Sequence, residues 1–427
     1  MDFTYVVRGG ATLRGDVTIS GSKNAALPLL AGSILADGEC VYTNVPRLSD
    51  IFAMLKILEY LGAETSFEGD TVRIRTTNLR SLPMTAELVG SFRASIVLLG
   101  PLLARFGVVE MAYPGGDVIG KRPVHAHITA FEQLGAQNMS TEDVIHLQGT
   151  LTAGHVILPE FSVTATENVI LAASALPGET RVDLAAAEPH VQDTAKLMTE
   201  MGAEIDGVGT HTLVIRGKKL LRGATHRIIS DYLEAGALTL ATLVTRGRVR
   251  LHDVDRWELL SFLDALRRFG CVWRYDDAER TLLVDGEISS LRSMTVRTNI
   301  FPGFPTDLQA TMGVAMTQAR GVSRIFERLY EGRMAYLYEL EKMGAHVEIL
   351  NAHQALIIGP SPLRGRTVAS NDLRAGAAMV LAGLCADGET TITDIRYIER
   401  GFDRLEEKLR SLGASIEKVQ GTNPLIR

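Results

Sequence analysis

Lysine, arginine and carboxylate side chains interrupt segments of this 427-residue chain that are otherwise apolar and helical in pattern. When six apolar segments are aligned, polar residues stand at equivalent places, which we predict to be helix N-termini: Lys23–Asn24, Arg93, Asn168, Glu234, Gln309 and Arg374. A helix N-terminus presents free N–H donors and a partial positive charge, so it favours anions, and a cation beside it strengthens the attraction. For any one of them taken alone, a helix cap or a surface charge is the better explanation. Lys23, Arg93 and Arg374 together favour an anion-binding site.

A loop rich in glycine and proline, residues 113–124, carries a carboxylate and cations, and histidines follow it. Asp117 and Arg122 are of the types that protonate a substrate or bind an anion, although Asp after Pro-Gly-Gly is also an ordinary turn former. His125 and His127 are spaced for a metal pair on one face of a strand. No third ligand is near them in the sequence, so no metal site is predicted.

A second candidate stretch reads Pro-Gly-Phe-Pro-Thr-Asp-Leu-Gln-Ala over residues 302–310. Asp307 is a carboxylate that can serve the chemistry of a site. Thr306 or Asp307 would equally pass as an ordinary N-cap after Pro305. The residues alone leave both interpretations open.

Internal repeats predict the elements that must position these residues. One phrase recurs six times: an amphipathic helix that ends in glycine, a small residue, and then an alternating stretch. The glycines lie 67 to 74 residues apart, at Gly62, Gly135, Gly202, Gly270, Gly344 and Gly413. Glycine accepts the left-handed conformation at a helix C-terminus, and chance does not explain six such ends at near-constant spacing.

Each repeat contains two different helices. The second is amphipathic, as in residues 51–61, where apolar residues recur at helical spacing after Ser49 as the N-cap. A hairpin-like alternation, such as residues 65–74, follows each glycine. The first helix is apolar nearly all round and must be buried on every side, in residues 25–35, 94–103, 169–176, 235–244, 310–316 and 375–384. We therefore predict an α/β fold of six repeats of about 70 residues.

Three buried helices surrounded by strands make a natural core, so six repeats predict two globules of three repeats each. The junction is expected around residues 216–230, a polar and basic stretch. Residues 6–20 supply the strand before the first buried helix, and the sequence leaves open which globule they pair with. The six helix N-termini are expected to converge on the space between the globules.

Composition excludes several classes of protein. The chain has 44 basic and 50 acidic residues and a formal net charge of −6, which argues against a general nucleic-acid binder. Its three cysteines, Cys40, Cys271 and Cys385, form no CxxC pair and suit a reducing compartment. The first residues lack the pattern of a signal peptide, and the most apolar runs, 94–104 and 375–386, are too short to span a bilayer. We expect a cytoplasmic protein.

Six phrases in order along the chain resemble those of the UDP-N-acetylglucosamine 1-carboxyvinyltransferases, the enolpyruvyl transferases of peptidoglycan synthesis. They are GSKNAALP (21–28), FRASIVLLGPLLARFG (92–107), PGGDVIGKRPV (114–124), PGFPTDLQA (302–310), NDLRAGAAMVLAG (371–383) and IERGFDRLEEKLRSLGA (398–414). The resemblance implies two inside-out α/β barrel domains with three repeats in each. One domain is discontinuous, residues 1–21 with 231–427, and the other, residues 22–230, carries the loop 113–124.

The resemblance also implies a reaction and roles for particular residues. Phosphoenolpyruvate donates its enolpyruvyl group to the 3′-hydroxyl of UDP-N-acetylglucosamine, and phosphate is released. Asp117 matches the acid that protonates the methylene carbon, and Asp307 matches the base that takes the hydroxyl proton. The cations that match phosphoenolpyruvate-binding positions are Lys23, Arg122, Arg374 and Arg400. Positions that match contacts to the nucleotide sugar are Asn24, Arg93, Pro123, Val124, His125, Ala126, Ser162, Val163 and Leu329.

The resemblance assigns a less definite role to Arg333 and implies no cofactor. Departures from the family pattern concern four other positions. Asp117 stands where Cys is usual, and His125 where Asp or Asn is common. Glu160 and Thr164 stand where Lys and Gly are common, beside the expected uridine pocket. Because an epoxide alkylates the usual loop thiol, the chain is expected to be insensitive to fosfomycin.

Two alternative functions stay open at this point. One is a 3-phosphoshikimate 1-carboxyvinyltransferase-like enzyme, although its first motif resembles Gly-Asp-Lys-Ser where this chain has Gly-Ser-Lys-Asn. The other is a catalytically silent paralogue that binds nucleotide sugar, which the changes at His125, Glu160 and Thr164 motivate.

Overall fold

The computed structural model describes residues 3–116, 123–370 and 372–420. They separate into two compact units. The N-terminal unit contains residues 21–116 and 123–229, and the C-terminal unit contains residues 3–20 together with the described residues from 230 onward. Each unit has its own hydrophobic core, and no buried apolar residue is shared between the two.

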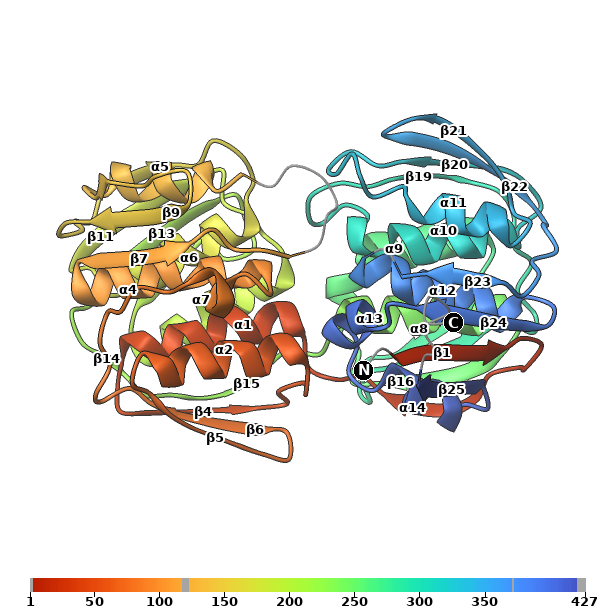
Figure 1. The fold of residues 1–427 in the computed structure, drawn as a ribbon, viewed down its shortest axis with the longest axis horizontal. Helices are drawn as coiled ribbons and strands as arrows, with labels where there is room; N and C mark the ends of the chain where they lie inside the picture. Colours follow the sequence, from red (N-terminus) through yellow and green to blue (C-terminus); the bar gives the residue numbers. More distant parts are fainter. Residues whose placement is uncertain (1–2, 117–122, 371, 421–427) are drawn as a thin grey trace, which may run out of the picture. The chain divides into compact units, whose positions relative to one another are not determined.

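The N-terminal unit is built on three buried helical segments: α1 (Lys23–Gly32), η2 (Arg93–Leu98) continued by α4 (Leu99–Phe106), and α6 (Val163–Ser174). These helices lie against one another, and sheets lie outside them (Figure 1). Amphipathic helices follow in the repeats: α2 (Ser49–Tyr60), α5 (His125–Gln133) and α7 (Pro189–Met201). Short segments complete the helical part: η1 (Ser33–Leu35) and α3 (Ala86–Val89).

Three main sheets belong to this unit. In sheet order their strands are β15 (Thr225–Arg227), β4 (Glu39–Thr43), β6 (Thr71–Arg75) and β5 (Glu64–Glu68); β7 (Val108–Ala112), β9 (Val144–Gln148) and β8 (Gln137–Asn138); and β10 (His155–Ile157), β11 (Gly178–Asp183), β13 (Thr212–Gly217) and β12 (Glu204–Asp206). A two-stranded sheet joins β14 (Leu221–Arg222) to β3 (Ala36–Asp37).

The C-terminal unit repeats the plan with α8 (Tyr232–Val244), α10 (Gln309–Thr317) and α12 (Leu373–Cys385) in mutual contact at its centre (Figure 1). All residues of α8 are buried, and all of α12 except the last. The remaining helical segments are η3 (Arg256–Leu259), α9 (Leu260–Phe269), η4 (Thr306–Leu308), α11 (Tyr336–Lys342), α13 (Arg396–Gly401) and α14 (Leu405–Ser411).

Its three sheets are four-stranded. In sheet order they contain β17 (Val272–Asp276), β18 (Thr281–Asp285), β16 (Arg248–His252) and β2 (Arg14–Thr18); β19 (Thr295–Arg297), β20 (Gly321–Phe326), β22 (Gln354–Gly359) and β21 (His346–Asn351); and β23 (Thr367–Ala369), β24 (Glu389–Thr393), β1 (Phe3–Arg8) and β25 (Ser415–Gln420). The described strands thus form separate sheets around buried helices, in a mixed α/β architecture.

The six glycines that define the repeat all adopt positive φ, from 91° at Gly270 to 121° at Gly202. A residue with a Cβ is strained in this conformation, so glycine is required where the amphipathic helix turns into the next strand. The predicted hairpin after Gly62 is also present, because β5 and β6 pair antiparallel around a turn at Gly69.

The N-terminal strands pair within the C-terminal unit, which answers the question that the sequence left open for residues 6–20. β1 pairs antiparallel with both β24 and β25, and β2 pairs parallel with β16. Among the described residues, β25 is the one strand after the last glycine, and β1 lies between β24 and β25, where the earlier repeats have a hairpin strand. In the N-terminal unit, β15 provides the parallel partner of β4 in the first repeat.

The buried His226 of β15 fastens that strand to α7. Its Nδ1 lies 2.7 Å from Glu200 Oε2, and its Nε2 lies 3.1 Å from Asp193 Oδ1. Burial lowers the pKa of His226, but the hydrogen bonds and charges of the two carboxylates outweigh burial and raise the pKa above its ordinary value. The protonated imidazole is therefore the form that the folded chain stabilises.

We predict that His226→Gln destabilises the protein more in mild acid than in mild base. A raised folded pKa gives stability that is complete below the unfolded pKa of ~6.5 and is lost as pH rises through the folded pKa. The difference in thermal unfolding midpoint between wild type and variant should be larger at pH about 6 than at pH about 8.5. His346→Gln, at an exposed histidine, is the matched control. A difference independent of pH would contradict the assignment.

Candidate active site

The carboxylate of Asp307 in the C-terminal unit lies between two buried arginines. Its Oδ1 accepts a hydrogen bond from Arg333 Nη1 at 2.6 Å, and its Oδ2 accepts one from Arg374 Nε at 3.0 Å. Arg333 is 6% exposed and Arg374 is 4% exposed. Burial by itself would raise the pKa of Asp307, but the two guanidinium groups outweigh burial and hold that pKa well below its ordinary value. Asp307 is therefore a carboxylate throughout the neutral pH range.

Each guanidinium keeps a buried N–H donor without a hydrogen-bond partner, namely Nε of Arg333 and Nη1 of Arg374. Both groups also lie over aromatic rings: Arg333 Cζ is 5.0 Å from the ring centroid of Tyr330, and Arg374 Cζ is 5.2 Å from that of Phe402. A buried donor without an acceptor is costly, so this cluster is suited to receive oxygen atoms of an anion.

Glu327, which lies just after β20, holds the residues around Asp307 in place through hydrogen bonds. Its Oε2 accepts a hydrogen bond at 2.7 Å from the hydroxyl of Thr306, and that hydroxyl in turn accepts one at 2.9 Å from Arg333. Its Oε1 accepts at 2.8 Å from the backbone N–H of Leu329. One buried carboxylate thus positions the residue before Asp307 and the loop that carries Leu329.

Lys23 in the N-terminal unit is the first residue of α1, which Ser22 caps through the N–H of Ala25. Its Nζ lies 3.3 Å from Asp50 Oδ2, and both side chains are largely buried. The partner carboxylate stabilises the ammonium inside the unit and keeps it in place at the helix start. Asn24 follows in the first turn and is partly exposed.

Arg93 begins η2 and donates from Nη2 to the carbonyl of Pro123 at 3.1 Å. Pro123 directly precedes Val124, which is the N-cap of α5, and the exposed His125 is the first residue of that helix. Ser162 caps α6 through the N–H of Ala165, and Val163 begins that helix. The N-terminal unit therefore presents three helix starts, each with a predicted site residue: Lys23 on α1, Arg93 on η2, and Val163 on α6.

The described residues include all predicted site positions except Asp117 and Arg122, which lie outside them. The structure brings Asp307 together with Arg374, and Arg93 together with Pro123. Arg400 lies near the C-terminal end of α13 and is partly buried. Ala126 is buried in α5, and Leu329 is exposed on its loop.

Three placements made from the sequence are wrong. Ser49 is the first residue of α2 rather than its N-cap. Asn168 is not at a helix N-terminus, because α6 begins at Val163, before the apolar run, and Asn168 therefore lies in its second turn. His125 and His127 lie on helix α5 rather than on a strand, with His125 exposed and His127 buried. Across the described ranges, no group of three or more residues is suited to hold a metal ion.

Glu234, which the sequence aligned with the site residues, has a structural role. Its Oε1 accepts a hydrogen bond from Lys408 Nζ at 2.6 Å, and its Oε2 accepts one from the backbone N–H of Ser20 at 2.7 Å. Burial raises its pKa although Lys408 opposes this effect. The pair fastens α14 and the N-terminal segment to the buried helix α8.

Sequence reasoning did not assign functions to Arg333, Asp50 or Glu327. Arg333 lies in the phrase YEGRM and matches a family arginine whose role is uncertain. Asp50 was hidden because an acidic residue in the first turn of an amphipathic helix is commonplace. Glu327 follows a strand as a single carboxylate, and only the folded chain shows that it contacts Thr306 and Leu329.

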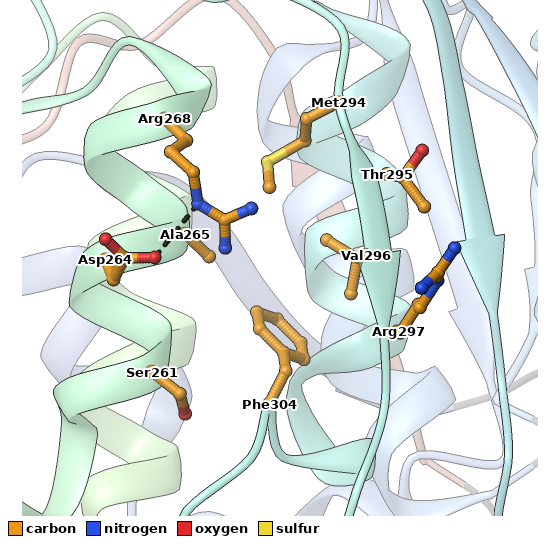
Figure 2. A pocket seen from close by; sticks show the side chains of 9 residues that line it. All are labelled: Ser261, Asp264, Ala265, Arg268, Met294, Thr295, Val296, Arg297 and Phe304. Atoms are coloured by element: carbon orange, nitrogen blue, oxygen red, sulfur yellow. Dashed lines mark hydrogen bonds and ion pairs between the residues drawn. The ribbon is translucent and has the colours of Figure 1, made fainter.

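A cavity of about 390 Å³ lies between α9 and β19 in the C-terminal unit (Figure 2). Met294, Val296 and Phe304 are among its lining residues, and Arg268 beside it is paired with Asp264 at 2.9 Å. Asp307, Arg333 and Arg374 are not among the lining residues. The cavity is therefore separate from the charged cluster, although Phe304 stands three residues before Asp307.

Comparison with known proteins places the chain in a class. The profile of the EPSP synthase (3-phosphoshikimate 1-carboxyvinyltransferase) family matches residues 7–409. The enolpyruvyl transferase NikO from Streptomyces tendae superposes with a TM-score of 0.89 at 22% identity, covering 99% of this chain and 100% of that chain. EPSP synthase from Acinetobacter baumannii superposes with a TM-score of 0.75 at 20% identity, covering 98% of this chain and 100% of that chain. The fold is that of the enolpyruvyl transferases.

Relatives with higher sequence identity narrow the class. UDP-N-acetylglucosamine 1-carboxyvinyltransferase from Magnetococcus marinus is 40% identical over 416 residues, which cover 97% of this chain and 99% of the relative. The protein of the same name from Shewanella putrefaciens is 40% identical over 417 residues, with the same coverage. The chain belongs to the UDP-N-acetylglucosamine 1-carboxyvinyltransferase family, and it is an enzyme. In the part of the chain that the structure describes, no helix is long and apolar enough to cross a membrane.

Proposed function

We propose that this enzyme transfers the enolpyruvyl group of phosphoenolpyruvate to the 3′-hydroxyl of UDP-N-acetylglucosamine with release of phosphate. This is the first committed step of peptidoglycan synthesis, and we place it in the cytoplasm. The observation that carries the proposal is the carboxylate of Asp307 between Arg333 and Arg374, a base beside donors for an anion. The full-length similarity to carboxyvinyltransferases supports it.

Phosphoenolpyruvate carries a phosphate and a carboxylate, so several cations must bind it. We assign this role to Lys23, Arg122, Arg374 and Arg400. Arg374 supports the assignment best, because its Nη1 is a buried donor without an acceptor. Lys23 is paired with Asp50, and an incoming anion would share the ammonium with that carboxylate.

The transfer needs one acid and one base. Asp117 protonates the methylene carbon of phosphoenolpyruvate, the 3′-oxygen bonds to the substituted carbon, and Asp307 takes the hydroxyl proton. Asp117, now a carboxylate, then takes a proton back from the new methyl group as the C–O bond to phosphate breaks, which restores the double bond. The hydroxyl proton held by Asp307 passes to the departing phosphate, so both carboxyl groups return to their starting forms. The oxocarbenium-like centre is stabilised electrostatically by nearby carboxylates. An anion that draws Arg374 toward itself weakens its pairing with Asp307 and makes that carboxylate a stronger base.

The nucleotide sugar is the larger substrate, and most of the predicted positions that serve it lie in the N-terminal unit. Arg93 supports this role because it is fixed by the carbonyl of Pro123 at the start of η2. Leu329 contributes from the C-terminal unit, where Glu327 holds its backbone. The remaining residues that we assign to this substrate are Asn24, Val124, His125, Ala126, Ser162 and Val163.

We also propose that the two units are domains of three repeats each, in the arrangement of an inside-out α/β barrel. Residues 1–21 with 231–427 form one domain, and residues 22–230 form the other. Separate cores, and three buried helices with three main sheets in each unit, support this division.

The product of the reaction tests the proposed function. The protein is incubated with phosphoenolpyruvate and UDP-N-acetylglucosamine, and the nucleotide fraction is analysed by mass spectrometry and proton NMR. We expect a nucleotide sugar with two vinylic protons on an ether at the 3′-oxygen. Conversion of shikimate 3-phosphate instead would favour the first alternative function. Tight binding of the nucleotide sugar without any product would favour the catalytically silent paralogue.

A further inference from the structure

The side chain of His127 is buried in the N-terminal unit and is hydrogen-bonded at both ring nitrogens. Nδ1 lies 2.8 Å from Asn168 Nδ2, and Nε2 lies 3.1 Å from Thr164 Oγ1. His127 is on α5, close behind the loop 113–124, and both of its partners are on α6. Burial, with a smaller effect from the charge of Arg93, lowers the pKa of His127 to about 3, so the ring is neutral at physiological pH.

The backbone fixes the orientation of the Asn168 amide. The N–H of Gly100 donates to Asn168 Oδ1 at 2.6 Å, so this oxygen faces α4. Asn168 Nδ2 donates to the carbonyl of Ile96 at 2.9 Å and has its second hydrogen directed at His127. A Cβ at position 100 would lie 2.3 Å from the backbone carbonyl oxygen of Asn168 and 2.9 Å from its Oδ1, so only glycine permits α4 to approach α6 this closely.

The amide orientation determines where the proton of His127 resides. Asn168 Nδ2 can only donate, so His127 Nδ1 must be the acceptor. The single proton of the neutral ring is therefore on Nε2, and it is donated to the hydroxyl oxygen of Thr164. Since Thr164 Oγ1 accepts this hydrogen bond, its own O–H is left as a donor. Among the described residues, this O–H has no acceptor at hydrogen-bond distance.

Thr164 directly follows Ser162 and Val163, two of the residues that we assign to the nucleotide sugar. It is partly exposed, whereas His127 and Asn168 behind it are buried. The hydroxyl therefore lies at the edge of the proposed substrate site, and the buried His127, whose own tautomer is fixed by Asn168, donates to it and sets its direction.

We propose that Thr164 is a specificity-determining residue that donates a hydrogen bond to an acceptor oxygen of the uridine diphosphate moiety. His127 and Asn168 are positioning residues that hold the Thr164 hydroxyl in the donor orientation. This inference rests on the proposed function, and it adds a contact at the position where the resemblance led us to expect glycine. It also connects the end of the loop 113–124 to the nucleotide site.

Calorimetric titration with UDP tests the donor directly. Thr164→Val keeps the shape and removes the hydroxyl, and we expect it to weaken UDP binding by about 3- to 10-fold, the usual effect of one hydrogen bond. Thr164→Ser should bind within about 2-fold of wild type. The KM for phosphoenolpyruvate should not change in either variant. Thr199→Val is the matched control, because the hydroxyl of Thr199 donates to the backbone carbonyl of Ala195 in the same helix.

Variants of His127 test the positioning role. His127→Gln offers a side-chain N–H to Thr164 and should retain most of the affinity, whereas His127→Leu should weaken UDP binding as much as Thr164→Val. The double variant of His127→Leu and Thr164→Val should bind no more weakly than either single variant, since the two residues act through one hydrogen bond. Long-range ¹H–¹⁵N spectra should show the Nε2–H tautomer of His127, and its Nε2 resonance should shift when UDP binds.

Three results would overturn the inference. UDP affinity unchanged in Thr164→Val would show that the hydroxyl makes no contact with the nucleotide. Equal losses for Thr164→Ser and Thr164→Val would point to packing instead of a donor, and a protonated Nδ1 in His127 would reverse the hydrogen bond. Failure of wild type to bind UDP would instead contradict the proposed function itself, so the two failures are distinguishable.

Discussion

Asp307→Asn will retain nucleotide-sugar binding within a few-fold and lose turnover by about 10²–10⁴-fold, the usual contribution of a general base. Asparagine has the shape of aspartate, but its amide cannot take the proton of the 3′-hydroxyl. In the wild-type enzyme, Arg333 and Arg374 flank the Asp307 carboxylate and keep it ionised at neutral pH. The loss should therefore appear in kcat, measured as phosphate release at saturating substrates.

The same substitution leaves two buried guanidinium groups without their counter-charge, so folding must be measured beside activity. Asp264→Asn, at an exposed carboxylate paired with Arg268 on α9, is the matched control and should keep full activity. If Asp307→Asn has a cooperative unfolding transition and near-normal kcat, Asp307 is not the base.

The enzyme will remain active in the presence of fosfomycin, and Asp117→Cys will become sensitive while it stays active. In family members with a cysteine in this loop, the epoxide alkylates the thiolate, and a carboxylate is a much weaker nucleophile toward an epoxide. Proton donation survives the exchange, because a protonated carboxyl can also serve as general acid. The acid that titrates in the pH–rate profile should differ between the two forms, since a carboxyl and a thiol have ordinary pKa values of ~4 and ~8.5.

The three native cysteines do not offer an alternative target. Burial raises the pKa of Cys271 and of Cys385 to about 12, and burial also raises the pKa of Cys40, so all three remain thiols. Mass spectrometry after incubation with fosfomycin and nucleotide sugar should find an adduct only on Asp117→Cys. Replacing Cys385 with alanine in that variant should leave the adduct unchanged. An adduct on wild type with loss of activity would contradict the prediction.

Local rules made much of the fold predictable from the sequence. Gly62 and its five counterparts predict helix ends because a positive φ is needed there, and the structure confirms this at each position. Uniformly apolar segments such as 235–244 predict buried helices, which are found in both units. The pairing of strands that are far apart in the sequence was not predictable. β1 pairs with β24 of the sixth repeat, and β15 pairs with β4 of the first, and local sequence patterns do not specify pairings between strands so far apart in the chain.

The site was predictable in residue type more than in contacts. Asp307 and Arg374 were both singled out, but the sequence gives no distance between residues 67 positions apart. Arg333 completes their cluster from yet another loop. Asn168 was misplaced because the polar turn before its apolar run is also helical, with Ser162 as the cap. The sequence alone does not specify which distant charges pair, or where a helix begins within a polar stretch. The folded chain shows both.

Phosphate release from phosphoenolpyruvate is the most direct test of the central claim. The enzyme is given phosphoenolpyruvate with UDP-N-acetylglucosamine, with shikimate 3-phosphate, or with no acceptor, and phosphate is followed continuously. We predict multiple turnovers with UDP-N-acetylglucosamine only, with one phosphate released for each enolpyruvyl ether formed. Turnover with shikimate 3-phosphate, or no turnover with any acceptor while the nucleotide sugar still binds, would contradict the account.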